Sequence, residues 1–473
     1  MPNLPFPEAT PESLGIHSAD LSRLVAVMDT LDQAHAFILT RHGKTAASGA
    51  WAPYSLDLPH ELLSLSKSFV SCAVGIAQSE GRLQINDRLL GFFPEAAGWN
   101  PAPAMRRVTL RHLLMMASGH DRCSLEFVDF AHGDWVRQIL ESPLFYEPGT
   151  RFTYNSGATF MLAAVIRRVT GENVVDYLTP RLFAPLGIAK PDWDCNPQGI
   201  NIGGWGLWLS AADLAKFTQL LLQKGNWEGK QLVPADYLKA ATGWQIDNSF
   251  NGSPDWATGY GYQFWQCQHR AFRGDGAAGQ YALVVPEQDL ALTFVSGICD
   301  MQRLLTAVWQ ELLPNLSDRP LPEDEAAHRE LQERLARLHT AAPEGIRPPE
   351  APGRGGRYRA APNPYSIGEV ELHFTPDACR LRVDGMTLDA GWGRYVQTPL
   401  PLASATSRPV ASAAAWDDAG RLQVRALCLA TTADFRFTVS FEDDEITVRR
   451  TTRIFFRRQD KDIIFRARKC RRE

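Results

Sequence analysis

Residues 60–77 constrain the fold more than any other stretch, because a single lysine lies inside an apolar segment. From Leu65 onward nearly every position is apolar or small, which predicts a helix buried on all sides. Burial disfavours the charged ammonium form, so Lys67 costs free energy unless neighbouring groups use it. The segment therefore predicts a central helix that carries a functional lysine.

Ser64 precedes Lys67 by three residues, which places both side chains on one helical face. An amine whose pKa falls toward neutrality can take the serine proton. The helix N-terminus adds backbone N–H groups where an oxyanion would form. One helix thus predicts a nucleophile, its base and part of an oxyanion hole. The alternative is a chance motif in which Lys67 extends to solvent.

Composition excludes several classes of function. The chain has 473 residues and a formal charge of -4, which gives no argument for nucleic-acid binding. The first residues lack a basic region followed by an apolar run, and no apolar stretch reaches the length of a membrane span, so we expect a cytoplasmic protein. The eight cysteines are scattered without a C-x-x-C pair, which favours free thiols and predicts no metal site and no cofactor.

A second candidate site lies in residues 147–157, where Tyr154, Asn155 and Ser156 precede an apolar helix. A Pro-Gly turn opens this stretch, so its polar side chains can point into a cleft. The alternative interpretation is that Asn155 or Ser156 only caps the helix that follows.

A third candidate covers residues 273–281. Gly274 to Gly279 formally fits the dinucleotide motif G-x-G-x-x-G, but a strand follows where that site needs a helix. We expect these glycines to lie at the edge of a strand, where a ligand can approach the backbone.

The order of elements predicts an α+β domain and then an all-β domain. A helix is expected over residues 11–34, a β-hairpin over 36–51, and a final strand and helix near residue 300, which suits an antiparallel sheet built from both ends with a helical insert. We predict domains at 1–318 and 354–473, joined by a helical connector and Pro/Gly linker at 319–353. Period-two alternation in the last part indicates a barrel or sandwich.

Three ordered motifs resemble those of the class C β-lactamase-related serine hydrolases and penicillin-binding proteins. They are Ser64-x-x-Lys67, Tyr154-Asn155-Ser156 and Gly274-Asp275-Gly276. The resemblance implies a β-lactamase/transpeptidase-like domain with an antiparallel sheet and helices on both faces. It implies Ser64 as the acylated nucleophile, Lys67 as its base, Tyr154 as a proton relay, and the amides of Ser64 and Ala277 as the oxyanion hole.

The resemblance also implies substrate-binding residues, and two of them depart from the family pattern. The implied set is Ser156, Asn155, Arg273, Gly274, Asp275 and Gly276. Ser156 stands where the family usually has Asn, and Gly274 stands where it has Lys or His, which removes a cation for a carboxylate. Arg273 is a candidate substitute, while Asp275 would repel an anion. We therefore expect hydrolysis of a small ester or amide. The alternatives are a weakly catalytic penicillin-sensing protein with the β-rich domain as effector, and a structural protein that retains only the fold.

Overall fold

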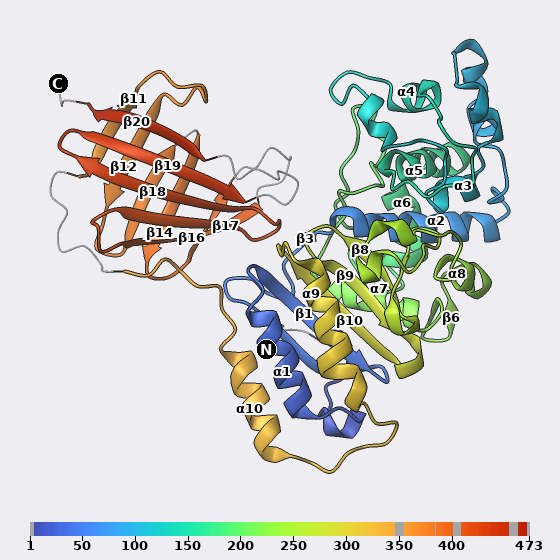
Figure 1. The fold of residues 1–473 in the computed structure, drawn as a ribbon, viewed down its shortest axis with the longest axis horizontal. Coiled ribbons are helices and arrows are strands. Elements are labelled where there is room, and N and C mark those ends of the chain that lie inside the picture. The colour runs from blue at the N-terminus through green and yellow to red at the C-terminus, as the bar shows by residue number, and fades with distance from the viewer. Residues whose placement is uncertain (1–3, 346–353, 384, 401–407, 454–461, 471–473) are drawn as a thin grey trace. The chain divides into compact units, whose positions relative to one another are not determined.

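The computed structural model describes residues 4–345, 354–383, 385–400, 408–453 and 462–470 (Figure 1). Its contacts divide the chain into two compact units. The first comprises Met1–Gly49, Leu56–Ser296 and Asp300–Arg337, and the second comprises Ala50–Ser55, Gly297–Cys299 and Leu338–Glu473. Part of the predicted linker, residues 346–353, lies outside the described residues.

A six-stranded sheet forms the centre of the first unit, in the order β2-β1-β10-β9-β8-β7. Its strands are β1 (Ala34–Arg41), β2 (Lys44–Ala50), β7 (Trp265–Gln266), β8 (Phe272–Gly276), β9 (Gln280–Val285) and β10 (Leu290–Ser296). The N-terminal hairpin joins the last strands because β1 pairs antiparallel with β10, and both strands are buried along their whole length. The prediction of a sheet assembled from both ends is confirmed.

Helices cover both faces of this sheet (Figure 1). On one face lies α7 (Ala211–Leu222), and on the other lie α1 (Ser18–Asp29) and α9 (Met301–Ala307). The helix predicted over residues 11–34 is shorter than expected, because a 3-10 turn at Glu12–Leu14 ends at Gly15 in the left-handed conformation. The connector helix α10 (Glu325–Ala336) is capped by Asp324 and packs against α1.

The helical insert surrounds α2 (Ser66–Ser79), which contacts α5, α6 and α8. Every residue from Ser66 to Ala77 is buried, so the predicted all-round burial of this helix is confirmed. The other elements of the unit are α3 (Leu110–Leu114), α4 (Trp135–Glu141), α5 (Ser156–Thr170), α6 (Val174–Leu178), α8 (Ala235–Ala241), β3 (His60–Glu61), β4 (Trp208–Leu209), β5 (Asn226–Trp227) and β6 (Lys230–Gln231).

The second unit is a closed barrel, which decides between the two all-β architectures left open by the sequence. Nine strands follow the order β14-β13-β12-β11-β20-β19-β18-β17-β16, and a parallel pairing of β14 with β16 closes the ring. The strands are β11 (Gly356–Ala360), β12 (Glu369–Phe374), β13 (Ala378–Val383), β14 (Met386–Trp392), β16 (Arg408–Trp416), β17 (Leu422–Cys428), β18 (Asp434–Glu442), β19 (Glu445–Arg453) and β20 (Ile463–Lys469). A further strand, β15 (Val396–Leu400), pairs with β16.

The barrel interior is filled by the apolar residues of the predicted alternation. In β13, for example, Cys379, Leu381 and Val383 are buried whereas Arg380 and Arg382 are exposed. Closure pairs every strand of the ring on both sides, so the interior side chains form one core.

The remaining observations concern the cysteines, membrane-spanning helices and metal-binding groups. All eight cysteines are free thiols. Among the described residues, no helix is long and apolar enough to cross a bilayer, and no group of His, Cys, Asp and Glu side chains could hold a metal ion.

Candidate active site

Ser64 lies in a short 3-10 turn, Leu63–Leu65, directly before α2. Leu63 has a φ of 49°, a left-handed conformation that costs an L-residue about 1–2 kcal/mol. The strain is held by neighbours, since Ser66 Oγ donates to the Leu63 carbonyl at 2.7 Å and accepts from the Leu207 amide at 3.2 Å. The serine therefore sits on a fixed, strained bend at the start of the helix.

Lys67 points back from the first turn of α2 to Ser64. Its Nζ donates to Ser64 Oγ at 2.9 Å and to the Gly204 carbonyl at 2.6 Å. The residue is 1% exposed, and burial lowers its pKa from 10.5 to about 7. A substantial fraction of the amine is therefore uncharged at neutral pH, as a base for Ser64 requires. The alternative in which Lys67 extends to solvent is excluded.

Tyr154 lies beside both groups, on the segment that leads into α5. The centre of its ring lies 4.9 Å from Lys67 Nζ. The ring also stacks on that of Trp265, with the two ring centres 5.6 Å apart. Burial raises the pKa of its phenol, while a hydrogen bond with Ser64 lowers that pKa and the charge of Asp275 raises it. The net direction is upward, so the phenol keeps its proton at neutral pH and is available as a donor.

The backbone amides of Ser64 and Ala277, which the sequence predicts as oxyanion donors, have no acceptor among the described residues. Ala277 lies in the turn between β8 and β9. Gln280 Nε2 donates to the Ala277 carbonyl at 3.1 Å, and Ser296 Oγ donates to the Ala278 carbonyl at 2.6 Å. The Ala277 amide donates no hydrogen bond within the described part of the chain. The Ser64 amide, at the start of a helical turn, lacks an intrahelical acceptor.

Asn155 is a helix cap, the alternative that the sequence kept open. It is fully buried, and its Oδ1 accepts from the amides of Gly157 and Ala158. Its Nδ2 donates to Ser118 Oγ at 3.3 Å, and Ser124 donates to its Oδ1 at 2.9 Å. The amide group is thus occupied by the protein, which corrects the substrate-binding prediction for this residue.

Ser156 begins α5 and is partly exposed. A Cβ placed on Gly204 would lie 3.1 Å from the Cβ of Ser156, so the segment that supplies the Lys67 acceptor also packs against this serine. Its role in substrate binding stays a prediction. The Gly203–Leu207 stretch therefore touches the site through the Gly204 carbonyl.

Gly274 and Gly276 are needed for packing against the nucleophile segment. A Cβ on Gly274 would lie 2.9 Å from Ser68 Oγ, and one on Gly276 would overlap the Leu62 carbonyl oxygen. The strand that carries them, β8, is an interior strand of the sheet between β7 and β9. The elements that approach Gly274 and Gly276 closely are the Ser64 turn and α2, and access of a ligand to the backbone of these glycines stays a prediction. The same contact explains why no long side chain stands at position 274.

Arg273 is fully buried, which corrects its proposed use as a carboxylate-binding group. Its guanidinium donates to Asp275 Oδ2 and to the Asp255 carbonyl, both at 2.7 Å, and lies 4.2 Å from the centre of the Trp256 ring. Burial raises the pKa of Asp275 above its ordinary value, although the Arg273 guanidinium acts in the opposite direction. Asp275 and Arg273 thus form a buried pair in which each group is the other's partner. Position 274, where the family pattern has a cation, is a glycine, and the next side chain is the carboxyl group that Arg273 holds.

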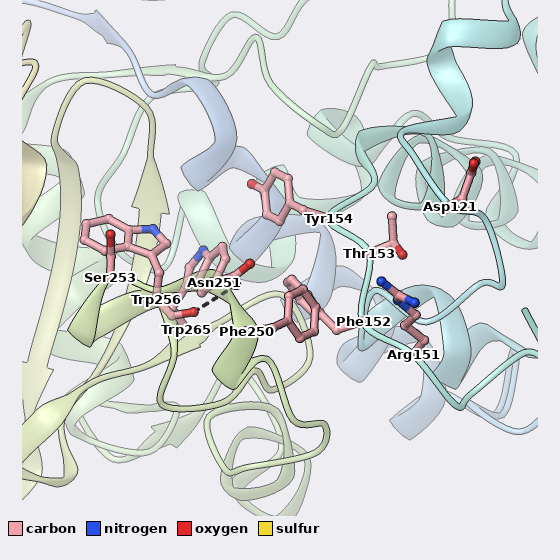
Figure 2. A pocket seen from close by; sticks show the side chains of 10 residues that line it. All are labelled: Asp121, Arg151, Phe152, Thr153, Tyr154, Phe250, Asn251, Ser253, Trp256 and Trp265. Atoms are coloured by element: carbon pink, nitrogen blue, oxygen red, sulfur yellow. Dashed lines mark hydrogen bonds between the residues drawn. The ribbon is translucent and has the colours of Figure 1, made fainter.

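A pocket of about 480 Å³ opens from Tyr154 (Figure 2). Figure 2 shows Trp256 and Trp265 on one side and Arg151, Thr153 and Asp121 on the other. The lining residues are Asp121, Arg151, Phe152, Thr153, Tyr154, Phe250, Asn251, Ser253, Trp256 and Trp265. The candidate site predicted at residues 147–157 already contained Arg151, Phe152, Thr153 and Tyr154, although only Tyr154 was given a role. The other lining residues were not predicted, and the aromatic residues of the 247–258 loop were the available signal.

Comparisons with known proteins identify the family of this chain and proteins that share its fold. A family model described as Beta-lactamase matches residues 28–298. Lovastatin esterase from Penicillium rubens is 26% identical over 251 residues, which cover 41% of this chain and 61% of that protein's length.

Two solved structures share the fold. A putative 6-aminohexanoate-dimer hydrolase from Bacillus anthracis has a TM-score of 0.52 at 20% identity, with 65% of this chain and 85% of that chain covered. SurE with D-Leu has a TM-score of 0.50 at 16% identity, with 96% of this chain and 99% of that chain covered. The second likeness extends over the C-terminal unit as well.

Proposed function

The chain belongs to the beta-lactamase family, and from this premise we propose that it is a serine hydrolase that cleaves a small ester or amide through an acyl-enzyme. The observation that carries the proposal is the 2.9 Å hydrogen bond between Lys67 Nζ and Ser64 Oγ, made by a buried amine whose pKa is about 7. Members of this fold family are hydrolases, and the relatives named above include an esterase.

In the proposed reaction, Ser64 Oγ attacks the substrate carbonyl while its proton passes to Lys67. The negative charge of the tetrahedral intermediate falls on an oxygen that faces the amides of Ser64 and Ala277. The intermediate collapses as the bond to the leaving group breaks, and Tyr154 gives its proton to the departing oxygen or nitrogen. Lys67 then returns a proton to Tyr154. Water attacks the acyl-enzyme by the same route and releases the acid.

The substrate side of the proposal rests on the third motif. A β-lactam carries a carboxylate next to its scissile amide, and here a glycine at position 274 supplies no cation for it. The neighbouring Arg273 is held by Asp275, so its guanidinium is not free to bind that carboxylate. We therefore place esters and uncharged amides above β-lactams, and the penicillin-sensing alternative gains no support from this strand.

Turnover of a short-chain chromogenic ester tests the proposal. Wild-type protein should hydrolyse it and react with a fluorophosphonate probe, and Ser64→Ala should lose both. Ser79→Ala, an exposed serine at the other end of the same helix, serves as the matched control and should keep both. Unchanged turnover in Ser64→Ala contradicts the proposal. Stable labelling by a chromogenic cephalosporin without ester turnover would favour the sensing alternative.

A further inference from the structure

Aromatic side chains form one wall of the pocket beside Tyr154. Tyr154, Phe152 and Trp265 form a continuous aromatic surface, with Phe152 and Trp265 ring centres 5.7 Å apart. Trp256 extends this surface, its ring centre 6.4 Å from that of Trp265. Such walls favour a flat or branched apolar group, and the volume of about 480 Å³ suits a small organic molecule.

The charges around the pocket do not cancel. Asp121 accepts two hydrogen bonds from Arg122, at 3.1 and 3.0 Å, which satisfy its carboxylate and lower its pKa. Arg273 and Asp275 pair with each other behind the tryptophans. Arg151, in contrast, makes no hydrogen bond or ion pair with any residue that the structure describes. One cation thus remains unpaired at the pocket.

Ring contacts hold the Arg151 guanidinium in place. Its central carbon lies 4.4 Å from the centre of the Tyr146 ring and 5.9 Å from that of Phe250. Figure 2 shows its nitrogens turned toward the interior of the pocket, on the side opposite Trp256. A stacked guanidinium keeps its edge N–H groups free, and this edge matches a carboxylate in two parallel hydrogen bonds.

The position of Tyr154 determines which part of a substrate enters this pocket. Its phenol is the donor to the leaving group in the proposed function, and its ring forms the pocket wall. A leaving group that receives its proton from Tyr154 must therefore extend along the aromatic wall. Arg151 is the one unpaired cation among the described residues that line the pocket, so an anionic group is better placed on its side.

We propose that Arg151 is a specificity-determining residue that binds a carboxylate on an aromatic or branched leaving group. The preferred substrates are then esters or amides whose released alcohol, phenol or amine carries a carboxylate distal to the scissile bond. This inference rests on the proposed function for the direction of the leaving group, and its binding test does not require turnover.

Matched aryl acetates test the proposal. 4-Acetoxybenzoate and 4-acetoxybenzamide have the same shape and differ in charge at the distal end. In wild type, the KM for 4-acetoxybenzoate should be lower than the KM for 4-acetoxybenzamide. Arg151→Gln should raise the KM for 4-acetoxybenzoate by roughly tenfold with kcat nearly unchanged, as expected for a charge-assisted hydrogen bond at a partly open site. The KM for 4-acetoxybenzamide should change by less than about twofold in the same variant. Arg151→Lys should recover part of the loss.

The released phenols provide a readout independent of catalysis. Binding of 4-hydroxybenzoate and 4-hydroxybenzamide is followed by tryptophan fluorescence, since two tryptophans line the pocket. Wild type should bind the anion more tightly, and Arg151→Gln should remove that preference. Arg319→Gln, an exposed arginine outside the pocket, is the control for loss of charge.

Equal binding of the two phenols by wild type, or a preference that survives in Arg151→Gln, overturns the inference. Preferred binding of a trimethylammonium analogue would also overturn it, because the aromatic walls would then serve a cation. If the wild-type protein shows no turnover that depends on Ser64 but still binds the anionic phenol more tightly, the proposed function is refuted and the binding role of Arg151 stands.

Discussion

The buried state of Lys67 predicts a coupled effect on stability and activity. Its pKa is lowered from 10.5 to about 7 because 99% of the residue is removed from water. At about 1.4 kcal/mol per pKa unit, the shift corresponds to an unfavourable contribution of about 5 kcal/mol at and below neutral pH. The two hydrogen bonds of Nζ offset about 1–3 kcal/mol of this unfavourable contribution.

The sign of the pH dependence follows from proton counting. Between pH 7 and 10.5 the unfolded chain holds a proton on this lysine and the folded chain does not. The free energy of unfolding therefore rises with pH across this window, by about 1.4 kcal/mol per unit. Lys67→Met has no such contribution, so the variant should be more stable than wild type by about 2–4 kcal/mol at pH 6, and its advantage should shrink as the pH rises toward 9.5.

Urea unfolding of the full chain at several pH values, followed by circular dichroism, measures this difference. Wild type and Lys67→Met contain the same barrel, so its contribution to the free energy of unfolding cancels in their difference. Lys44→Met, at an exposed position of β2, is the control, and its free energy of unfolding should change with pH in the same way as that of wild type. In wild type, the rate of Ser64 acylation should rise tenfold per pH unit below 7 and level off above it. A constant stability difference between wild type and Lys67→Met from pH 6 to 9.5 would refute the assignment of a depressed pKa.

Three further predictions concern the scaffold and the relay. Asn155→Ala should lower the free energy of unfolding by about 3 kcal/mol, because the cap of α5 is lost and buried partners are left unpaired; a change below about 0.5 kcal/mol in thermal or urea unfolding contradicts this. Gly276→Ala should abolish fluorophosphonate labelling, since its Cβ would overlap the Leu62 carbonyl, whereas Gly91→Ala, which meets open space, should label normally. Tyr154→Phe should reduce kcat about 100-fold for alkyl esters, which need a proton on the leaving oxygen, and much less for 4-nitrophenyl esters; equal losses for both would remove Tyr154 as the donor.

Local sequence was sufficient for the elements whose contacts lie close along the chain. The serine and lysine of one helical turn meet because their spacing is fixed by helix geometry, and the apolar residues after Leu65 require that helix to be buried. The alternation in residues 354–473 likewise predicts strands with one buried face. Whether these strands form a barrel or a sandwich depends on the pairing of β14 with β16, which no local pattern specifies.

The substrate-facing part of the site was decided by tertiary structure, because its residues come from separate segments. Asn155 and Arg273 are polar residues within apparent motifs, and only their burial shows that the protein itself occupies them. Arg151 and Trp265 are distant in sequence and meet at one pocket, Arg151 from the segment before α5 and Trp265 from β7. Sequence determined the pair of reacting groups at the start of α2, since helical geometry fixes neighbours three residues apart. The fold alone determined the charge and shape that a substrate meets.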